Sequence, residues 1–158
     1  MWKTILEALK IVHVAPNDGA TTTYALSAGT TDVNSVKVDA SGFGRICFLC
    51  IFGDNADTGT FTGKIEGSAN GTDGWTAVTG ATTTFTAGAS DTDNEMIAVE
   101  CDVLPAYRYY RFVSDRGTAN TVIAALLALL GKAQGQIPVT QSTAAGDFVQ
   151  TPVNVIGA

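Results

Sequence analysis

Charged side chains are scarce in this sequence. Only 15% of its 158 residues are Asp, Glu, Lys or Arg, against about 25% in typical soluble domains. The net charge is −6, and the nine basic residues are scattered along the chain. Nucleic-acid binding depends on Lys and Arg contacts with phosphates, so we expect no nucleic-acid partner. With so few charges, the surface must be covered by hydroxyls and glycine or be buried against other subunits.

Histidine is almost absent, since His13 is the only one. One histidine cannot build a zinc-binding His-Glu-x-x-His pair, and no serine stands in a Gly-x-Ser-x-Gly turn that would make a hydrolase nucleophile. No glycine-rich loop precedes a helix in the manner that binds phosphates. We therefore expect a protein without catalytic residues and without a cofactor.

Cysteine is limited to three residues. Cys47 and Cys50 lie in the apolar run Ile46–Phe52, which has the character of a strand. Residues three apart in a strand point to opposite faces, so the pair is badly placed for a disulfide or a shared metal. Cys101 alone cannot complete a four-ligand zinc site. We expect small apolar core residues, no metal, and synthesis in a reducing host cytoplasm.

Long hydrophobic runs are also missing. The most apolar segment, Val122–Leu130, spans nine residues, whereas a membrane-spanning helix needs about 20. The N-terminal segment is interrupted by Glu7 and Lys10, which is unlike a signal peptide. We expect a soluble protein with no membrane partner.

The sequence is instead rich in threonine and glycine, with 22 and 17 residues. Thr favours pleated strands and Gly favours turns, and 46% hydrophobic residues suffice for a core. Apolar and polar residues alternate from Thr21 onward, and turn signals recur every eight to twelve residues or so. This pattern predicts an all-β fold, an antiparallel β-sandwich or jelly roll. Predicted strands are 22–28, 35–39, 45–52, 59–67, 75–78, 82–86, 96–103 and 107–113.

The segment Thr121–Leu130 suits either a buried helix or a buried strand. It begins with Thr-Val-Ile and follows a hairpin-length turn at 115–120, so the strand is favoured.

Both ends of the chain differ from its middle. Residues 2–12 have the spacing of a short amphipathic helix or arm, and a helix of this length is marginal unless it docks on a surface. After Lys132 the chain has few charges and reads as an extended tail. We divide it into an N-terminal helix or arm (1–16), a β-sandwich domain (17–132) and an extended C-terminal tail (133–158). Candidate assembly contacts are Trp2, Ile5, Leu6, Leu9, Ile137, Val139, Phe148 and Val149.

Two further kinds of site stay open. The loops containing Asp54 and Asp57, and Asp91 and Asp93, offer oxygen ligands for calcium, although acidic residues also favour turns and neither loop has EF-hand spacing. Separately, four aromatic residues could form a platform on which sugar rings stack, although such residues commonly fill a sandwich core. These aromatic residues are Trp75, Tyr107, Tyr109 and Tyr110.

Three segments together resemble small head-associated proteins of tailed bacteriophages. Gly63–Val78 has a strand, a Ser-x-Asn-Gly loop and a Trp-x-x-Val return; Ala106–Phe112, followed by Arg116–Ala119, is similar to a second hairpin of that group. Leu126–Val139 is similar to its final strand and exit. The resemblance implies a decoration, or cement, protein: a β-sandwich or jelly roll, often trimeric, without catalytic residues, on the outside of the capsid.

From this resemblance we expect a virion protein that binds the lattice of the major capsid protein and stabilises it by bridging capsomers. A homotrimer would engage several sites at once and gain avidity. The alternative is a carbohydrate-binding β-sandwich module on a virion or tail surface. Other virion parts, such as a tail component, stay open.

Overall fold

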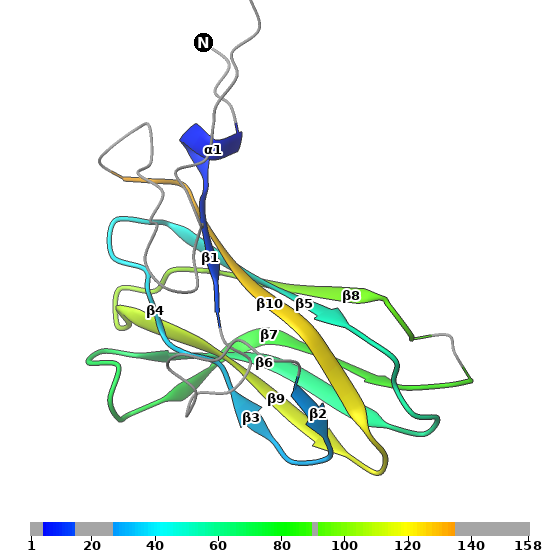
Figure 1. Ribbon diagram of the computed structural model, residues 1–158. Coiled ribbons are helices and arrows are strands. Elements are labelled where there is room, and N and C mark those ends of the chain that lie inside the picture. The colour runs from blue at the N-terminus through cyan, green and yellow to red at the C-terminus, as the bar shows by residue number, and fades with distance from the viewer. Residues whose placement is uncertain (1–4, 15–26, 90–91, 135–158) are drawn as a thin grey trace, which may run out of the picture.

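The computed structural model describes residues 5–14, 27–89 and 92–134. They form two antiparallel sheets that pack face to face, which confirms the predicted all-β sandwich (Figure 1). The elements are α1 (Ile5–Ala8), β1 (Lys10–His13), β2 (Ser27–Gly29), β3 (Val33–Asn34), β4 (Val38–Asp39), β5 (Arg45–Phe52), β6 (Thr60–Ser68), β7 (Thr76–Thr86), β8 (Met96–Asp102), β9 (Tyr109–Gly117) and β10 (Thr121–Gly131).

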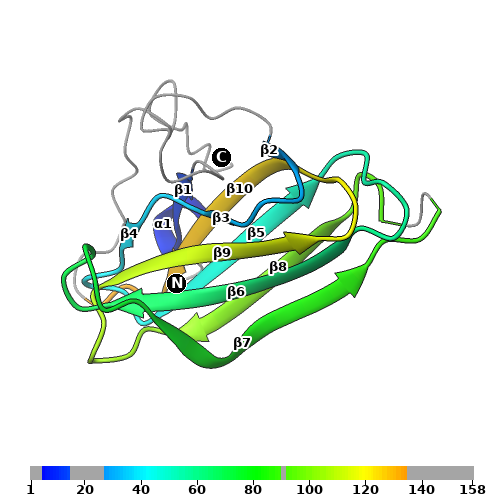
Figure 2. The same ribbon diagram turned by 90° about the horizontal axis from the view of Figure 1, so that it is seen from below.

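The strand order identifies the fold as a jelly roll. Sheet A has the order β1-β10-β5-β8, with β2 also on β10, and sheet B has the order β3-β9-β6-β7, with β4 also on β9. The outer strand of each sheet is therefore split into two short pieces along one neighbour. Counted this way, each sheet has four strand positions, and the chain crosses between the sheets as a double Greek key does. In Figure 2, β9, β6 and β7 lie in front of sheet A.

Aromatic rings join the two sheets in the core. Phe52 of β5 meets Phe61 of β6 edge to face, with ring centroids 4.9 Å apart, and it meets Phe85 of β7 at 5.0 Å. Phe48 of β5 lies 5.8 Å from Phe112 of β9. These rings come from alternate positions of their strands, because successive side chains of a strand point to opposite faces.

The segment that suited either helix or strand is the strand β10, in the centre of sheet A. Its register with β5 shifts between Ile123 and Ala125, so the strand has a bulge there. An extra residue reverses the alternation of a strand, and after the bulge Leu126, Ala128 and Leu130 point inward. Leu127 and Leu129 consequently point outward.

The N-terminal helix is shorter than predicted. Within the described residues it is limited to α1, and Lys10–His13 is the strand β1, paired with Leu127–Leu130 of β10. Its β-branched residues Ile11 and Val12 suit a strand better than a helix. Docking on β10 therefore takes the form of strand pairing.

Several predicted strands have different limits in the structure. Of the segment 35–39, residues 35–37 connect β3 to β4 and only Val38–Asp39 is a strand; in the connection, Ser35 Oγ accepts a hydrogen bond from the Phe112 N–H at 2.9 Å. The two strands predicted at 75–78 and 82–86 are one strand, β7, with an irregular register opposite β6. Of the predicted strand 22–28, the structure describes only its last residues, within β2.

Candidate functional site

The predicted assembly contacts divide between described and undescribed residues. Trp2, Ile137, Val139, Phe148 and Val149 lie outside the described residues, as does the side chain of Leu6. Ile5 is 69% exposed on α1. The backbone N–H of Leu9 donates to the Ile5 carbonyl at 2.9 Å, and the Leu9 side chain lies against Gly131 at the end of β10. Both described candidates are therefore near the α1 end of sheet A.

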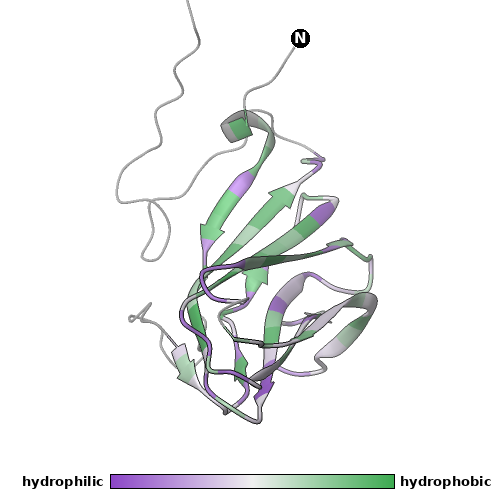
Figure 3. Cartoon of the chain, turned by 90° about the vertical axis from the view of Figure 1, so that its right-hand side faces the viewer, coloured by the Kyte–Doolittle hydropathy of each residue, from purple (hydrophilic) through white to green (hydrophobic). Residues whose placement is uncertain are grey.

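The outer face of sheet A is apolar, and we call it the apolar face. The strand pairing aligns its residues in rows across the sheet. One row consists of Ile11, Leu129, Cys47 and, at the β8 edge, Glu100; the next consists of His13 at the β1 edge, then Leu127, Leu49 and Ala98. The third row consists of Ala125, Ile51 and Met96, of which Met96 is 59% exposed. Figure 3 shows hydrophobic colour along the strands next to α1.

This face is unusual for an antiparallel sheet. Such sheets commonly bury one side and expose a polar other side, and sheets that are apolar on both sides are covered on both. Leu49, Ile51, Leu127 and Leu129 are half-buried by their neighbours. Covering each of them fully would contribute on the order of 1 kcal/mol. The face therefore has the composition of a surface that another protein layer covers.

Charged residues border the apolar face at one corner. Arg45 Nε lies 3.1 Å from Glu100 Oε1 and 3.3 Å from Asp102 Oδ1, and Lys132 Nζ lies 3.9 Å from the same Asp102 oxygen. All four side chains are substantially exposed. Apolar side chains at the centre and charges at the rim are the usual arrangement of a protein interface.

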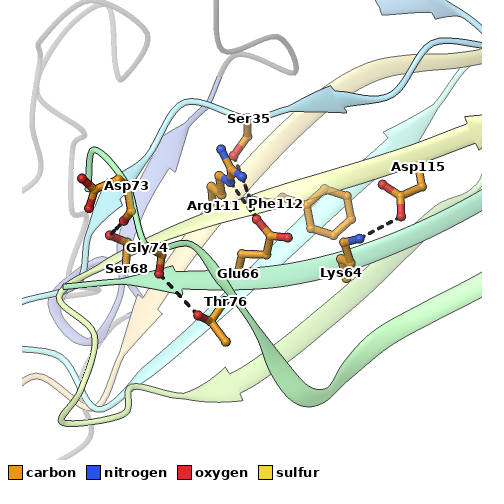
Figure 4. A network of polar contacts seen from close by, with 10 residues as sticks. All are labelled: Ser35, Lys64, Glu66, Ser68, Asp73, Gly74, Thr76, Arg111, Phe112 and Asp115. Carbon is orange, nitrogen blue, oxygen red and sulfur yellow. Dashed lines mark hydrogen bonds and ion pairs between the residues drawn. The ribbon is translucent and has the colours of Figure 1, made fainter. Parts of the chain in front are cut away.

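The outer face of sheet B is polar, and we call it the polar face. Thr62 and Thr84 are directly opposite on β6 and β7, with their hydroxyl oxygens 3.1 Å apart. Lys64 Nζ donates to Asp115 Oδ2 at 2.9 Å, and this hydrogen bond raises the pKa of Lys64. Figure 4 shows this pair and the neighbouring Glu66–Arg111 pair. Hydroxyls and paired charges are side-chain groups that can stay in contact with water.

The four aromatic residues considered as a sugar platform have different environments. Tyr110 is fully buried, and its hydroxyl oxygen accepts a hydrogen bond from the Leu104 N–H at 2.7 Å. Tyr107 packs against the core, with its ring edge to face with that of Tyr110. Tyr109 lies beneath the cations of Lys37 and Arg108. Trp75 lies beneath the guanidinium of Arg111, 4.5 Å from the ring centroid. The four rings do not form one platform.

The three cysteines are free thiols, and their surroundings favour the protonated form. Cys50 and Cys101 are buried, and burial raises the pKa of Cys50 to about 12 and that of Cys101 to about 11. Cys47 points to the opposite side of β5, where burial and the nearby Glu100 raise its pKa. A thiol that stays protonated is a poor nucleophile. The prediction that Cys47 and Cys50 face opposite ways is confirmed.

The two acidic loops come together around a buried asparagine. The Asn55 N–H donates to Asp93 Oδ1 at 2.8 Å, and the Asn55 side chain bonds the Thr92 carbonyl and the Val122 N–H. Asp91 lies outside the described residues. In the part of the chain that the structure describes, no group of three or more His, Cys, Asp or Glu residues could hold a metal ion. Within the same part, no helix has the length and hydropathy to cross a membrane.

Comparison with known proteins shows resemblance of fold only. No family model and no curated sequence matches the chain. The structure is similar to Eiger TNF from S. frugiperda, with 9% identity and a TM-score of 0.43 over 84% of this chain and 98% of that one. It is also similar to PirA, with 14% identity and a TM-score of 0.33 over 82% of this chain and 96% of that one. A third similar structure is a chain of infectious bursal disease virus, Gx strain, with 11% identity and a TM-score of 0.40 over 82% of this chain and 34% of that one. Likeness at this level describes the sandwich and says nothing about function.

Proposed function

We propose that this protein is a structural component of a virus particle, a decoration protein that binds the outer capsid lattice and bridges neighbouring capsomers. In this proposal the chain performs no chemical step, and its contribution is the free energy of binding that it adds to the lattice. It acts on the outer surface of the virion, as a homotrimer.

The observation that carries the proposal is the apolar face of sheet A. Its three rows of mostly apolar, half-buried side chains run across β1, β10, β5 and β8, and apolar patches on a protein surface commonly mark protein–protein interfaces. Ile5 and Leu9 continue the same surface at its upper end. A module that must cover such a face gains stability by assembling with other proteins.

The motifs that resemble phage head proteins lie on the hairpins of the sandwich. Gly63–Val78 covers most of β6, its hairpin loop and the start of β7, and Arg116–Ala119 leads from β9 into β10. Arg116 is 7% exposed. Its guanidinium donates to the carbonyls of Thr31, Ser27 and Thr121 at 2.8 to 3.1 Å. The motif residue Arg116 therefore fixes the loop before β3 to the turn after β9.

A trimer would strengthen weak contacts with a lattice. When one copy has bound, the others are held close to neighbouring sites, and the effective local concentration raises the overall affinity. Several modest apolar contacts are then sufficient for stable attachment.

The test has two steps and uses the full chain. Light scattering gives the oligomeric state, for which we expect a trimer. Co-sedimentation with purified expanded capsids of the virus that encodes the chain then measures binding, for which we expect saturation at a fixed number of copies per capsid. A monomer that stays in the supernatant with capsids would contradict the proposal.

A further inference from the structure

A small hollow lies at one end of the polar face of sheet B, away from the apolar face. Its volume is about 300 Å³, at the small end of the range for ligand sites. Three segments that are distant in sequence line it: the connection between β3 and β4, the β6–β7 loop with Trp75, and β9. We call it the Trp75 hollow; the residues used below are Lys37, Gly71, Thr72, Trp75 and Arg111.

The loop that forms one wall of the hollow is held by its own hydrogen bonds. Ser68 Oγ donates to the Asp73 carbonyl at 2.6 Å and accepts from the Gly71 N–H at 3.0 Å. Asn70 Oδ1 accepts from the N–H groups of Thr72 and Asp73. Gly71 has a φ of +70°, and a Cβ there would meet the Tyr109 ring at 2.8 Å. The wall is therefore formed before any ligand arrives, which lowers the entropic cost of binding.

Arg111 fixes the aromatic side of the hollow. Its Nε and Nη2 both donate to Glu66 Oε2, at 3.0 and 2.8 Å, and only 19% of the Arg111 side chain is exposed. Its guanidinium covers one face of the Trp75 ring. Arg111 is also one of the residues that line the hollow.

Lys37 adds a second cation to the lining of the hollow, from the connection between β3 and β4. Its Nζ donates to the Gly71 carbonyl at 3.0 Å and lies 5.3 Å from the centre of the Tyr109 ring. An ammonium has three donors, and one is used here. Among the residues that the structure describes, no carboxylate pairs with Lys37. The two charged residues that line the hollow, Lys37 and Arg111, are therefore both positive, in a chain whose net charge is −6.

We propose that the Trp75 hollow binds a saccharide that carries a carboxylate, with its ring against Trp75 and its carboxylate between Lys37 and Arg111. The apolar face of a sugar ring packs on an aromatic ring, while the cations form charge-assisted hydrogen bonds with the acid. Gly71 and Thr72 also line the hollow, and in this proposal their oxygens bond ring hydroxyls. A hollow of this size suits one or two rings better than an extended acidic peptide.

The inference retains carbohydrate binding, but the proposed site contains one of the four aromatic residues considered in the sequence, Trp75, together with the cations Lys37 and Arg111. It does not depend on the capsid proposal, because the hollow and the apolar face belong to opposite sheets. Capsid co-sedimentation and sugar binding can therefore succeed or fail separately.

The experiment is an NMR titration of the full chain with glucuronic acid and, as a matched control, with glucose, which has a hydroxymethyl group in place of the carboxylate. We expect glucuronic acid to shift the Trp75 indole N–H signal and to bind at least about tenfold more tightly than glucose. Increasing salt should weaken the binding of glucuronic acid and leave the binding of glucose unchanged, because screening acts on the charged contacts.

Variants identify the groups that bind. Lys37→Gln changes an exposed side chain and should lower the ratio of the affinities for glucuronic acid and glucose by about tenfold. Trp75→Ala should abolish binding of both sugars. Lys64→Gln removes a cation of the same polar face outside the hollow and should bind as the unchanged protein does. Circular dichroism establishes that each variant is folded, and Lys37→Gln decides the result if Trp75→Ala is not.

Three outcomes would overturn the inference. In the first, glucuronic acid leaves the Trp75 signal unmoved. In the second, it binds no better than glucose, or Lys37→Gln and Lys64→Gln weaken it equally. In the third, a glutamate-rich peptide binds through Trp75 and Lys37 while sugars do not, which assigns the hollow to another class of ligand.

Discussion

The two outer faces of the sandwich have the same strand geometry and opposite chemistry. Sheet A presents Leu49, Ile51, Leu127 and Leu129 outward, whereas corresponding positions of sheet B carry threonines and ion pairs such as Lys64–Asp115. Either face would be stable as the covered side of a sheet. Only the polar face is also suited to permanent contact with water.

The difference between the two faces suggests how the domain is oriented in an assembly. An antiparallel sheet with one buried face does not need leucines on its other face, and in the proposed function the outward leucines of sheet A contact other proteins. The threonines of sheet B keep the high strand preference of a β-branched residue and offer hydroxyls to solvent. We infer that sheet A faces other proteins and sheet B faces outward.

The largest expected effect comes from placing a charge on the apolar face. Leu49→Asp points a carboxylate outward between Leu127 and Ala98, where the free chain leaves it hydrated. Burial against a partner would leave the carboxylate without a counter-charge, at a cost of several kcal/mol. We expect capsid affinity to fall by about 100-fold or more in co-sedimentation.

The matched control for this substitution is on the polar face. Thr82→Asp introduces the same side chain at an exposed position of β7 opposite Lys64, and we expect unchanged capsid binding. Equal losses in both variants would remove the distinction between the faces.

Cys47 is a natural reporter within the apolar face. A maleimide should modify it before the buried Cys50 and Cys101, although burial raises its pKa and slows the reaction. When the chain is bound to capsids, we expect the rate at Cys47 to fall about tenfold, measured by mass spectrometry. Rapid modification at the same rate in free and bound chain would mean that the face stays open.

On the polar face, the half-buried ion pair should matter more than the exposed one. Arg111→Met leaves the Glu66 carboxylate, which is 15% exposed, without its partner, and we expect a loss of about 1–3 kcal/mol in the free energy of unfolding. Lys64→Met breaks a more exposed pair and should cost less than about 1 kcal/mol. Urea denaturation measures both, and an equal cost would show that burial does not govern these pairs.

The smallest effect concerns pH. A hydrogen bond from Arg108 lowers the pKa of Asp39 from 3.8 to about 2. A carboxyl with a lowered pKa stabilises the folded state above its unfolded value, and this contribution disappears as the pH falls toward 2. Above about pH 4, the Arg108→Gln variant should therefore have a slightly lower melting temperature than the unchanged protein. The difference in melting temperature should vanish at acid pH. A difference that persists below pH 2 would assign the effect to packing.

Local patterns were sufficient to predict most of the sandwich. The run Arg45–Phe52 was predicted as a strand with its observed limits, because after Arg45 it is continuously apolar, as a central sandwich strand is. The bulge in β10 was not predicted, since an extra residue changes the pairing with a distant strand without altering the local pattern. The N-terminal helix was predicted too long because spacing alone does not distinguish Lys10–His13 as an edge strand.

The candidate sites depended on longer-range information. The apolar face had a signal in sequence, since Arg45–Phe52 is apolar on both sides, but this was interpreted only as the mark of a central strand. A central position explains the inward side chains, Ile46 and Phe48, and leaves Leu49 and Ile51 unexplained. The Trp75 hollow had no local signal, because strand pairing alone brings Arg111 next to Glu66.

The central claim is that sheet A faces protein and sheet B faces solvent. Cryo-electron microscopy of expanded capsids incubated with the full chain tests it most directly, since the two sheets are distinguishable in a map at side-chain resolution. We predict density from capsid protein or neighbouring copies against β1, β10 and β5, with the outer surface of β6 and β7 uncovered. A map in which sheet B contacts the lattice while the leucines of sheet A face open solvent would contradict the account.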